Sequence, residues 1–189
     1  ATGNAEREHA LQQIVAGCDR ATHLVSQMLT LARLDADKEQ SLQELALHPL
    51  AEQLLAGLAG EAIAQGCELT LADGDARVQG NPGLLQAMLR NLVDNALHHG
   101  NASQITIAIA GNDGKTRLTV SDDGKGIPAS ERETVQQRFR RGTSADSPGS
   151  GLGLSIVRRI VELHGGKLSL EENADGRGLI ASIDLPGVN

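Results

Sequence analysis

Two asparagines four residues apart, Asn91 and Asn95, stand in the run Asn91-Leu92-Val93-Asp94-Asn95-Ala96. In a helix this spacing places both side chains on one face. Amide side chains on a packed helix can coordinate Mg²⁺ through oxygen and can contact phosphates. An exposed polar helix face is the alternative interpretation of such a pair. We expect Asp94 to point elsewhere, so it is not a candidate ligand.

An acid and two glycines, Asp122, Gly124 and Gly126, follow at the end of a strand-like run. A carboxylate there can accept a hydrogen bond from an exocyclic amine such as that of adenine, and glycines let the backbone turn sharply or approach a ligand. A solvated turn is the alternative. Residues 124–129 also fit the dinucleotide pattern GxGxxA loosely. Two carboxylates before the first glycine would repel a pyrophosphate, and Pro128 falls just before the expected helix, so we discount that match.

The run Gly149-Ser150-Gly151-Leu152-Gly153-Leu154 opens a predicted helix. Backbone N–H groups of a glycine-rich segment can face an anion, and a helix start adds its positive end. Gly149, Gly151, Leu152 and Gly153 are therefore candidate phosphate contacts, with a flexible turn as the alternative. The run is not a Walker A loop, because no Lys-Ser/Thr follows. Gly114-Lys115-Thr116 fails as well, since Ile109 stands where the first glycine should be.

The elements that must position these residues follow from periodicity and turn signals. The sequence predicts helices that begin near Pro49, after the N-cap Asn81 and at Leu152, and end near residues 65, 98–99 and 164. Strands are predicted over 67–71, 77–79, 104–110, 116–121, 167–171 and 179–185. Strands 104–110 and 116–121 should form a hairpin with a loop longer than two residues. Residues 122–151 indicate a functional loop or lid. The fold class is α+β: a two-layer sandwich with helices on one face of a mixed sheet.

A separate helix is predicted over residues 6–37, where apolar or small residues recur in alternating steps of three and four. Such a stripe needs partners, so we favour a bundle or dimer element over a helix packed on its own domain. The polar run 35–43 indicates a linker. We therefore divide the chain into residues 1–40, the end of a helical domain, and residues 41–189. Because the pattern begins abruptly, we expect that the chain is cut from something longer.

The bulk composition limits the partners. The formal charge is −7 and the pI is about 5.3, which argues against a broad basic face for nucleic acid. The short cluster Arg138, Arg140 and Arg141 suits a small anion better. Cys18 and Cys67 show no disulfide or zinc pattern, so a reducing compartment is the default. No signal peptide is visible, and no apolar run approaches the roughly 20 residues that span a bilayer. With Phe139 as the sole aromatic residue, the core must consist of Leu, Ile, Val and Ala.

The order of these motifs resembles the catalytic domain of bacterial sensor histidine kinases, within the wider ATPase group that includes gyrase, Hsp90 and MutL. The resemblance covers roughly residues 47–185. Residues 29–35, Leu-Thr-Leu-Ala-Arg-Leu-Asp, resemble the end of the second dimerisation helix. The resemblance to sensor histidine kinases implies a Bergerat-type fold, ATP and Mg²⁺ as ligands, and a homodimeric full-length protein. The implied reaction is transfer of the γ-phosphoryl group to a histidine, for relay to a response-regulator aspartate. The resemblance also implies the cytoplasmic face of the inner membrane as the native location.

The resemblance assigns roles by position. Asn95 matches the Mg²⁺ ligand, and Asn91 stands where hydrolytic relatives carry a Glu that activates water. Asp122 matches the acid that reads the adenine amine, with Gly124 and Gly126 shaping that side of the pocket. Phe139 matches a lid aromatic, and Arg141 matches a lid arginine that reaches the terminal phosphate. Gly149, Gly151 and Gly153 match the second glycine box.

Three departures from the family pattern stand out. His98 and His99 replace a basic residue and an aromatic, leaving His98 as a possible phosphate donor, and Arg140 replaces another aromatic. None of the six histidines has the phosphoacceptor context of His, an acid, a basic residue and Pro. We therefore expect no autophosphorylation unless an acceptor is supplied in trans. The alternatives are an ATPase of the same fold, an anti-sigma factor kinase and a degenerate nucleotide-binding module.

Overall fold

The computed structural model describes residues 42–137, 140, 151–173 and 176–188, together with residues 7, 17, 22, 25 and 27–30 of the N-terminal segment. These N-terminal residues are helical, in agreement with the predicted helix over 6–37. Most of that helix and most of the predicted linker 35–43 fall outside the described residues. Among the residues described, no helix is both long and apolar enough to cross a lipid bilayer.

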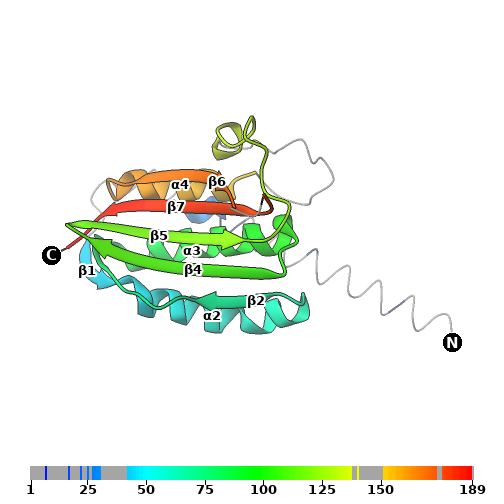
Figure 1. The fold of residues 1–189 in the computed structure, drawn as a ribbon, viewed down its shortest axis with the longest axis horizontal. Helices are drawn as coiled ribbons and strands as arrows, with labels where there is room; N and C mark the ends of the chain where they lie inside the picture. The colour runs from blue at the N-terminus through cyan, green and yellow to red at the C-terminus, as the bar shows by residue number, and fades with distance from the viewer. Residues whose placement is uncertain are drawn as a thin grey trace.

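A five-stranded mixed sheet forms one layer, with the strand order β2-β4-β5-β7-β6 (Figure 1). Its strands are β2 (Glu68–Leu71), β4 (Gln104–Asn112), β5 (Lys115–Asp122), β6 (Lys167–Glu172) and β7 (Leu179–Pro186). Only the pairing of β2 with β4 is parallel, and the other three pairings are antiparallel. The predicted mixed sheet is therefore confirmed.

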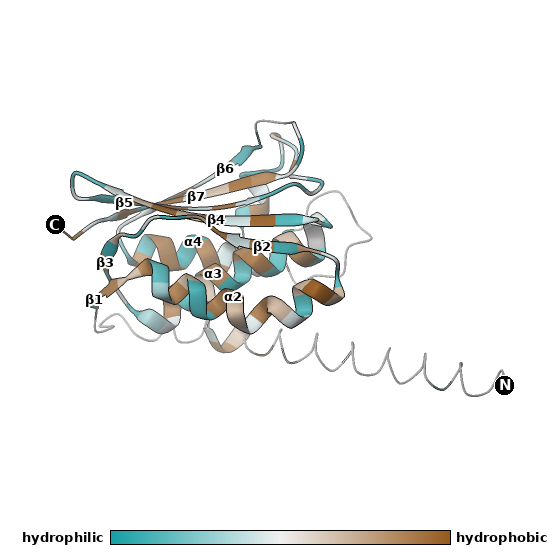
Figure 2. Cartoon of the chain, turned by 60° about the horizontal axis from the view of Figure 1, so that its bottom comes forward, coloured by the Kyte–Doolittle hydropathy of each residue, from teal (hydrophilic) through white to brown (hydrophobic). Residues whose placement is uncertain are grey.

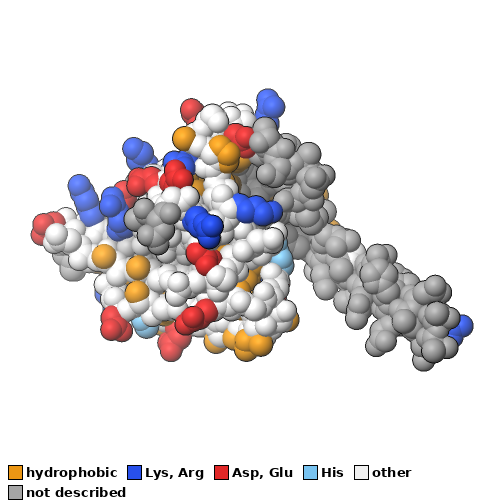
Figure 3. All heavy atoms as spheres, turned by 45° about the vertical axis from the view of Figure 1, so that its right-hand side comes forward, with side chains coloured by type: hydrophobic (Ala, Val, Ile, Leu, Met, Phe, Trp, Pro, Cys, Tyr) orange, Lys and Arg blue, Asp and Glu red, His pale blue; other side chains and the backbone are white. Residues whose placement is uncertain are grey.

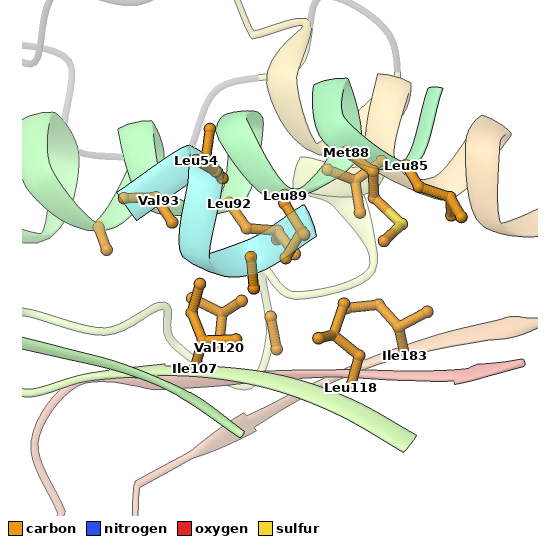
Figure 4. Close-up of a cluster of buried hydrophobic side chains, with 14 of the residues drawn as sticks. Leu54, Leu85, Met88, Leu89, Leu92, Val93, Ile107, Leu118, Val120 and Ile183 are labelled. Atoms are coloured by element: carbon orange, nitrogen blue, oxygen red, sulfur yellow. The ribbon is translucent and has the colours of Figure 1, made fainter. Parts of the chain in front are cut away.

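Three helices cover one face of this sheet: α2 (Leu47–Ala64), α3 (Pro82–Asn95) and α4 (Gly153–Leu163) (Figure 2). Between the layers, Leu85, Met88 and Leu89 of α3 face Leu118 of β5 and Ile183 of β7 (Figure 4). All five are fully buried, and burying a side chain of this size stabilises the fold by about 1.5–3 kcal/mol. The buried apolar residues described are aliphatic, apart from Met88 and Cys67, as the composition predicts.

The N-cap of helix α3 and the π-helical turn after its last residue determine where Asn91 and Asn95 lie. The Asn81 side chain accepts a hydrogen bond from the Leu84 N–H at 3.1 Å, and Pro82 opens the helix, as predicted. The α-helix ends at Asn95, earlier than predicted, and continues as a π-helical turn, η1 (Ala96–Gly100). Such turns are rare and often occur at functional sites.

One strand was not predicted from the sequence, and one loop prediction was wrong. Residues Gln43–Ala46 form a strand, β1, which pairs with β3 (Arg77–Gly80) in a separate two-stranded sheet. The run Gln-Glu-Leu-Ala lacks strand alternation, so its conformation depends on β3. The β4–β5 hairpin loop has only two residues, Asp113 and Gly114, both with positive φ. Gly111, Asn112 and Lys115 extend the ladder beyond the apolar alternation and leave a two-residue Asp-Gly turn.

Candidate nucleotide-binding site

Asp122 is the last residue of β5, and its side chain turns inward. The residue is 8% exposed, and its Oδ1 accepts a hydrogen bond from the Gly124 N–H at 2.9 Å. A Cβ built on Gly100 would lie 3.5 Å from the same oxygen. Burial raises the pKa of Asp122, although the N–H groups of Gly124 and Leu179 act in the opposite direction. A carboxylate in this position retains lone pairs for a ligand amine.

The neighbouring Asp123 has a different environment. It is exposed and accepts hydrogen bonds from the N–H groups of Ser103 and Gln104 at 2.8 and 2.9 Å, and from the Ser103 hydroxyl. The Ser103 hydroxyl is the main cause of the lowered pKa of Asp123. The Asp123 carboxylate thus accepts the hydrogen bonds of the backbone at the start of β4. Of the two adjacent acids, only Asp122 has its side chain turned inward.

The glycines after Asp122 bring the loop against η1 and the β6–β7 loop. A Cβ on Gly124 would lie 2.3 Å from the Gly100 carbonyl oxygen, and the Lys125 N–H donates to that same oxygen at 2.9 Å. Gly126 has φ +67°, and a Cβ there would lie 2.5 Å from the Gly178 carbonyl oxygen. Both approaches are too close for a side chain, which explains this glycine spacing.

Asn91 and Asn95 lie beside the first residue of α4. A Cβ on Gly153 would lie 3.2 Å from the Asn95 Oδ1 and 3.3 Å from the Asn91 Oδ1. Asn91 is only 6% exposed, so the exposed-face interpretation is wrong for it. Its Nδ2–H donates to the Ala87 carbonyl at 2.8 Å. The buried Nδ2 of Asn95 has no hydrogen-bond partner among the residues that the structure describes.

The start of α4 has the form that an anion site needs. Gly151 has φ +66°, and the buried Leu152 is the N-cap residue. The Leu152 carbonyl accepts hydrogen bonds from the Ile156 N–H and the Ser155 hydroxyl, which fixes the first turn. The first N–H groups of a helix have no carbonyl partner within it and carry the positive end of its dipole. They lie next to the two asparagines, because Gly153 does.

His98 lies toward α2 instead. Its Nε2 is 3.0 Å from Glu61 Oε1, and its Nδ1 is 3.4 Å from Gln65 Nε2. The two ring nitrogens therefore contact α2 and its C-cap residue Gln65, and the structure does not direct the His98 side chain toward the asparagines. Asp94 pairs with the Arg90 guanidinium at 3.4 Å, consistent with its exclusion as a ligand.

Several predicted positions lie outside the described part of the chain: Phe139, Arg141, Gly149 and the His99 side chain. Their roles stay predictions. Arg140 is described and exposed.

Sequence reasoning missed three residues that contact the site. Gly100 lies against Asp122 and Gly124, but its position after a helix indicated only a helix end. The Asn173 amide donates to the Asp122 carbonyl at 3.2 Å from the β6–β7 loop. Gln27 donates from its Nε2 to the Asn91 Oδ1 at 2.9 Å. The last two contacts span 51 and 64 residues, a separation at which no local pattern gives a signal.

A separate hollow lies at the opposite end of β5, lined by residues 75–77, the β4–β5 turn and Gly187. It contains none of the candidate residues.

Acidic and basic side chains are interspersed on the face that Figure 3 shows.

Residues 80–189 match the family described as "Histidine kinase-, DNA gyrase B-, and HSP90-like ATPase". The chain belongs to this ATPase family. It is 38% identical over 179 residues to the sensor protein kinase PmrB of Pseudomonas aeruginosa, covering 93% of this chain, and 37% identical over 176 residues to the sensor protein QseC of Salmonella typhi, covering 90%. This chain spans 38% of the length of each of those two relatives.

Solved structures agree with the fold. A mycobacterial sensor histidine kinase, MprB, matches with a TM-score of 0.68 at 28% identity, covering 77% of this chain and 97% of the other. Full-length ShkA, solved in complex with AMPPNP, matches with a TM-score of 0.78 at 27% identity, covering 90% of this chain and 36% of the other. The predicted α+β fold of a histidine kinase ATP-binding domain is thereby confirmed.

Proposed function

We propose that this chain binds ATP with Mg²⁺ and transfers the γ-phosphoryl group to a histidine on a dimerisation helix, for relay to a response-regulator aspartate. In this proposal the chain is part of a longer, homodimeric membrane sensor, and its kinase domain works on the cytoplasmic side. The observation that carries the proposal is the meeting of Asn91 and Asn95 with the first turn of α4. Gly100 connects this corner to Asp122.

In this proposal, different residues bind the adenine and the phosphates of the nucleotide. The Asp122 carboxylate accepts a hydrogen bond from the exocyclic amine of adenine, and Gly124 keeps the surrounding loop closed against Gly100. The phosphates lie at the positive end of α4, next to the N–H groups of its first turn. Phe139, Arg141 and Gly149 complete the site in this proposal, as their positions in the family pattern imply.

Asn95 suits a magnesium ion that is held mainly by phosphate oxygens. Mg²⁺ usually takes few protein ligands and completes its shell with waters and substrate phosphates. The described residues contain no cluster of three or more His, Cys, Asp or Glu side chains fit for a metal. The buried Nδ2 of Asn95 has no hydrogen-bond partner among those residues. Rotating the carboxamide by 180° exchanges the nitrogen and the oxygen, which places the oxygen at this unpartnered position. When bound, the metal supplies charge neutralisation at the phosphates.

Asn91 determines which nucleophile can react. An amide cannot remove a proton from water, so the site lacks a general base for hydrolysis at this position. A neutral imidazole nitrogen attacks with its own lone pair. The new N–P bond forms as the bond from the γ-phosphorus to the β,γ-bridging oxygen breaks, ADP leaves, and the imidazole then loses its ring proton. An Asn at position 91 therefore favours transfer to histidine over ATP hydrolysis.

The test supplies the acceptor in trans. The chain is incubated with γ-labelled ATP, Mg²⁺ and a separately prepared dimerisation hairpin that carries a phosphoacceptor histidine. We expect label on the hairpin in an acid-labile, base-stable form, and none after replacement of the acceptor histidine by Ala. Nucleotide binding without transfer would favour a regulatory nucleotide-binding module, and rapid phosphate release without label would favour an ATPase.

A further inference from the structure

Gln27 connects the N-terminal segment to Asn91. Its Nε2 donates to the Asn91 Oδ1 at 2.9 Å across 64 residues of sequence. Gln27 is only 6% exposed, whereas Val25, Met28 and Leu29 beside it are more than half exposed. Among the described residues here, the helix therefore meets the domain through a buried polar side chain, while these three apolar side chains lie at the surface.

The carboxamide of Asn91 has both of its ends engaged within the protein. One of its two Nδ2–H groups donates to the Ala87 carbonyl, and its Oδ1 accepts from Gln27. A phosphate oxygen would need an N–H of this group, and a donor on an incoming nucleophile would need its oxygen. The bond to Ala87 lies within the helix that carries Asn91. The bond to Gln27 comes from a separate segment, so it is lost when that segment moves or when the Gln27 side chain loses its N–H donor.

We propose that Gln27 is a positioning residue that fixes the orientation of the Asn91 carboxamide, so that this group does not turn an N–H toward the terminal phosphate. The proposal rests on the nucleotide site of the proposed function. Loss of the contact frees the Asn91 carboxamide to rotate and to donate an N–H to the γ-phosphate beside Gly153. ADP has no γ-phosphate, so the Gln27 contact lowers the affinity for ATP and leaves the affinity for ADP unchanged.

The experiment compares two nucleotides on the full 189-residue chain. Gln27→Met preserves the length and helix propensity of the side chain but removes its N–H donor. Calorimetric titration with Mg²⁺ and a non-hydrolysable ATP analogue should show an affinity about 2- to 10-fold higher than that of the unaltered chain, the range expected for one net hydrogen bond. The affinity for ADP should stay the same. Met28→Ala, at an exposed neighbour, is the matched control and should change neither affinity.

A double-mutant cycle separates this role from a general structural one. If Gln27 acts through Asn91, then Gln27→Met has no effect on the ATP-to-ADP preference in an Asn91→Ala background. An unchanged or lowered preference in Gln27→Met, or a gain that persists without Asn91, would overturn the inference. If the unaltered chain binds neither nucleotide, the proposed function itself fails, which is a different and visible result.

Discussion

Asp122 and Asp123 show how adjacent side chains of one type acquire different chemistry. Asp123 is exposed and satisfied by the backbone at the start of β4, so it is stabilised as a carboxylate. Asp122 is buried against Gly100, and burial opposes its charge. Burial thus disfavours the charged form of Asp122. A hydrogen bond from a ligand amine can replace the water contacts that its carboxylate loses on burial.

Replacing Asp122 should change how the stability of the fold depends on pH. Because its pKa is raised in the folded state, its contribution to stability is present below the unfolded-state pKa and is lost as the pH rises through the folded-state pKa. For Asp122→Asn, the free energy of unfolding relative to the unaltered chain should therefore increase from about pH 4 upward and then level off. Urea unfolding at a series of pH values measures this. A difference that does not vary with pH would contradict it.

Gly153→Ala should weaken nucleotide binding without unfolding the protein. The new Cβ would press on the amide tips of Asn91 and Asn95 at 3.2–3.3 Å, while Ala is a better helix former than Gly. We expect the free energy of unfolding to change by less than about 1 kcal/mol and the affinity for Mg·ATP to fall several-fold. Gly57→Ala is the control, because no atom lies within 4 Å of a Cβ there. Equal affinities for all three proteins would contradict the placement of phosphate beside Gly153.

At the scale of elements, His164 joins the end of α4 to the start of α3. Its Nδ1–H donates to the Ile160 carbonyl at 2.7 Å, and its Nε2 accepts the Asn81 N–H at 3.1 Å. The residue is 7% exposed. This connection fixes the two helices whose other ends carry Asn95 and Gly153.

His164→Ala should destabilise the fold by about 1–3 kcal/mol, since it leaves the Asn81 N–H without its partner. Chemical denaturation measures the loss, and His48→Ala, at a less buried histidine, should cost clearly less. If both substitutions have the same small effect, the His164 connection does not stabilise the pairing of α3 and α4.

The elements were predictable where local signals and burial agree. Asn81-Pro82 marked the start of α3, and apolar alternation marked β4, β5 and β7, because these strands face the helices. Strand β1 carries no alternation and depends on β3, so it was missed. The π-turn at Ala96–Gly100 depends on contacts with the loop after β5 that no local sequence pattern encodes.

At the scale of the whole molecule, the proposed domain boundary near residue 41 can be tested by truncation. A chain of residues 41–189 retains β1, whose Leu45 pairs with the fully buried Val78. We expect it to keep nearly the full free energy of unfolding. A chain of residues 47–189 loses that strand, and we expect a loss of about 2–4 kcal/mol from the ladder and the apolar contact. Equal stability of the two truncated chains would contradict a structural role for β1.

The site was predictable as a set of residues, but only in part as a geometry. The spacing of Asn91 and Asn95 and the glycine at 153 indicated groups that the structure brings together. The direction of His98 depends on Glu61 of α2 and on Gln65, the C-cap residue of that helix. The contact of Gln27 with Asn91 likewise depends on how the N-terminal segment lies on the domain.

The most direct test of the central claim is a calorimetric titration of the full chain with a non-hydrolysable ATP analogue and Mg²⁺, with NAD as competitor. We predict that the analogue binds, that Asp122→Ala abolishes binding, that Asn95→Ala removes the dependence on Mg²⁺, and that NAD does not compete. Failure of the analogue to bind, or equal binding to both variants, would contradict the assignment of this corner of the fold as an ATP site.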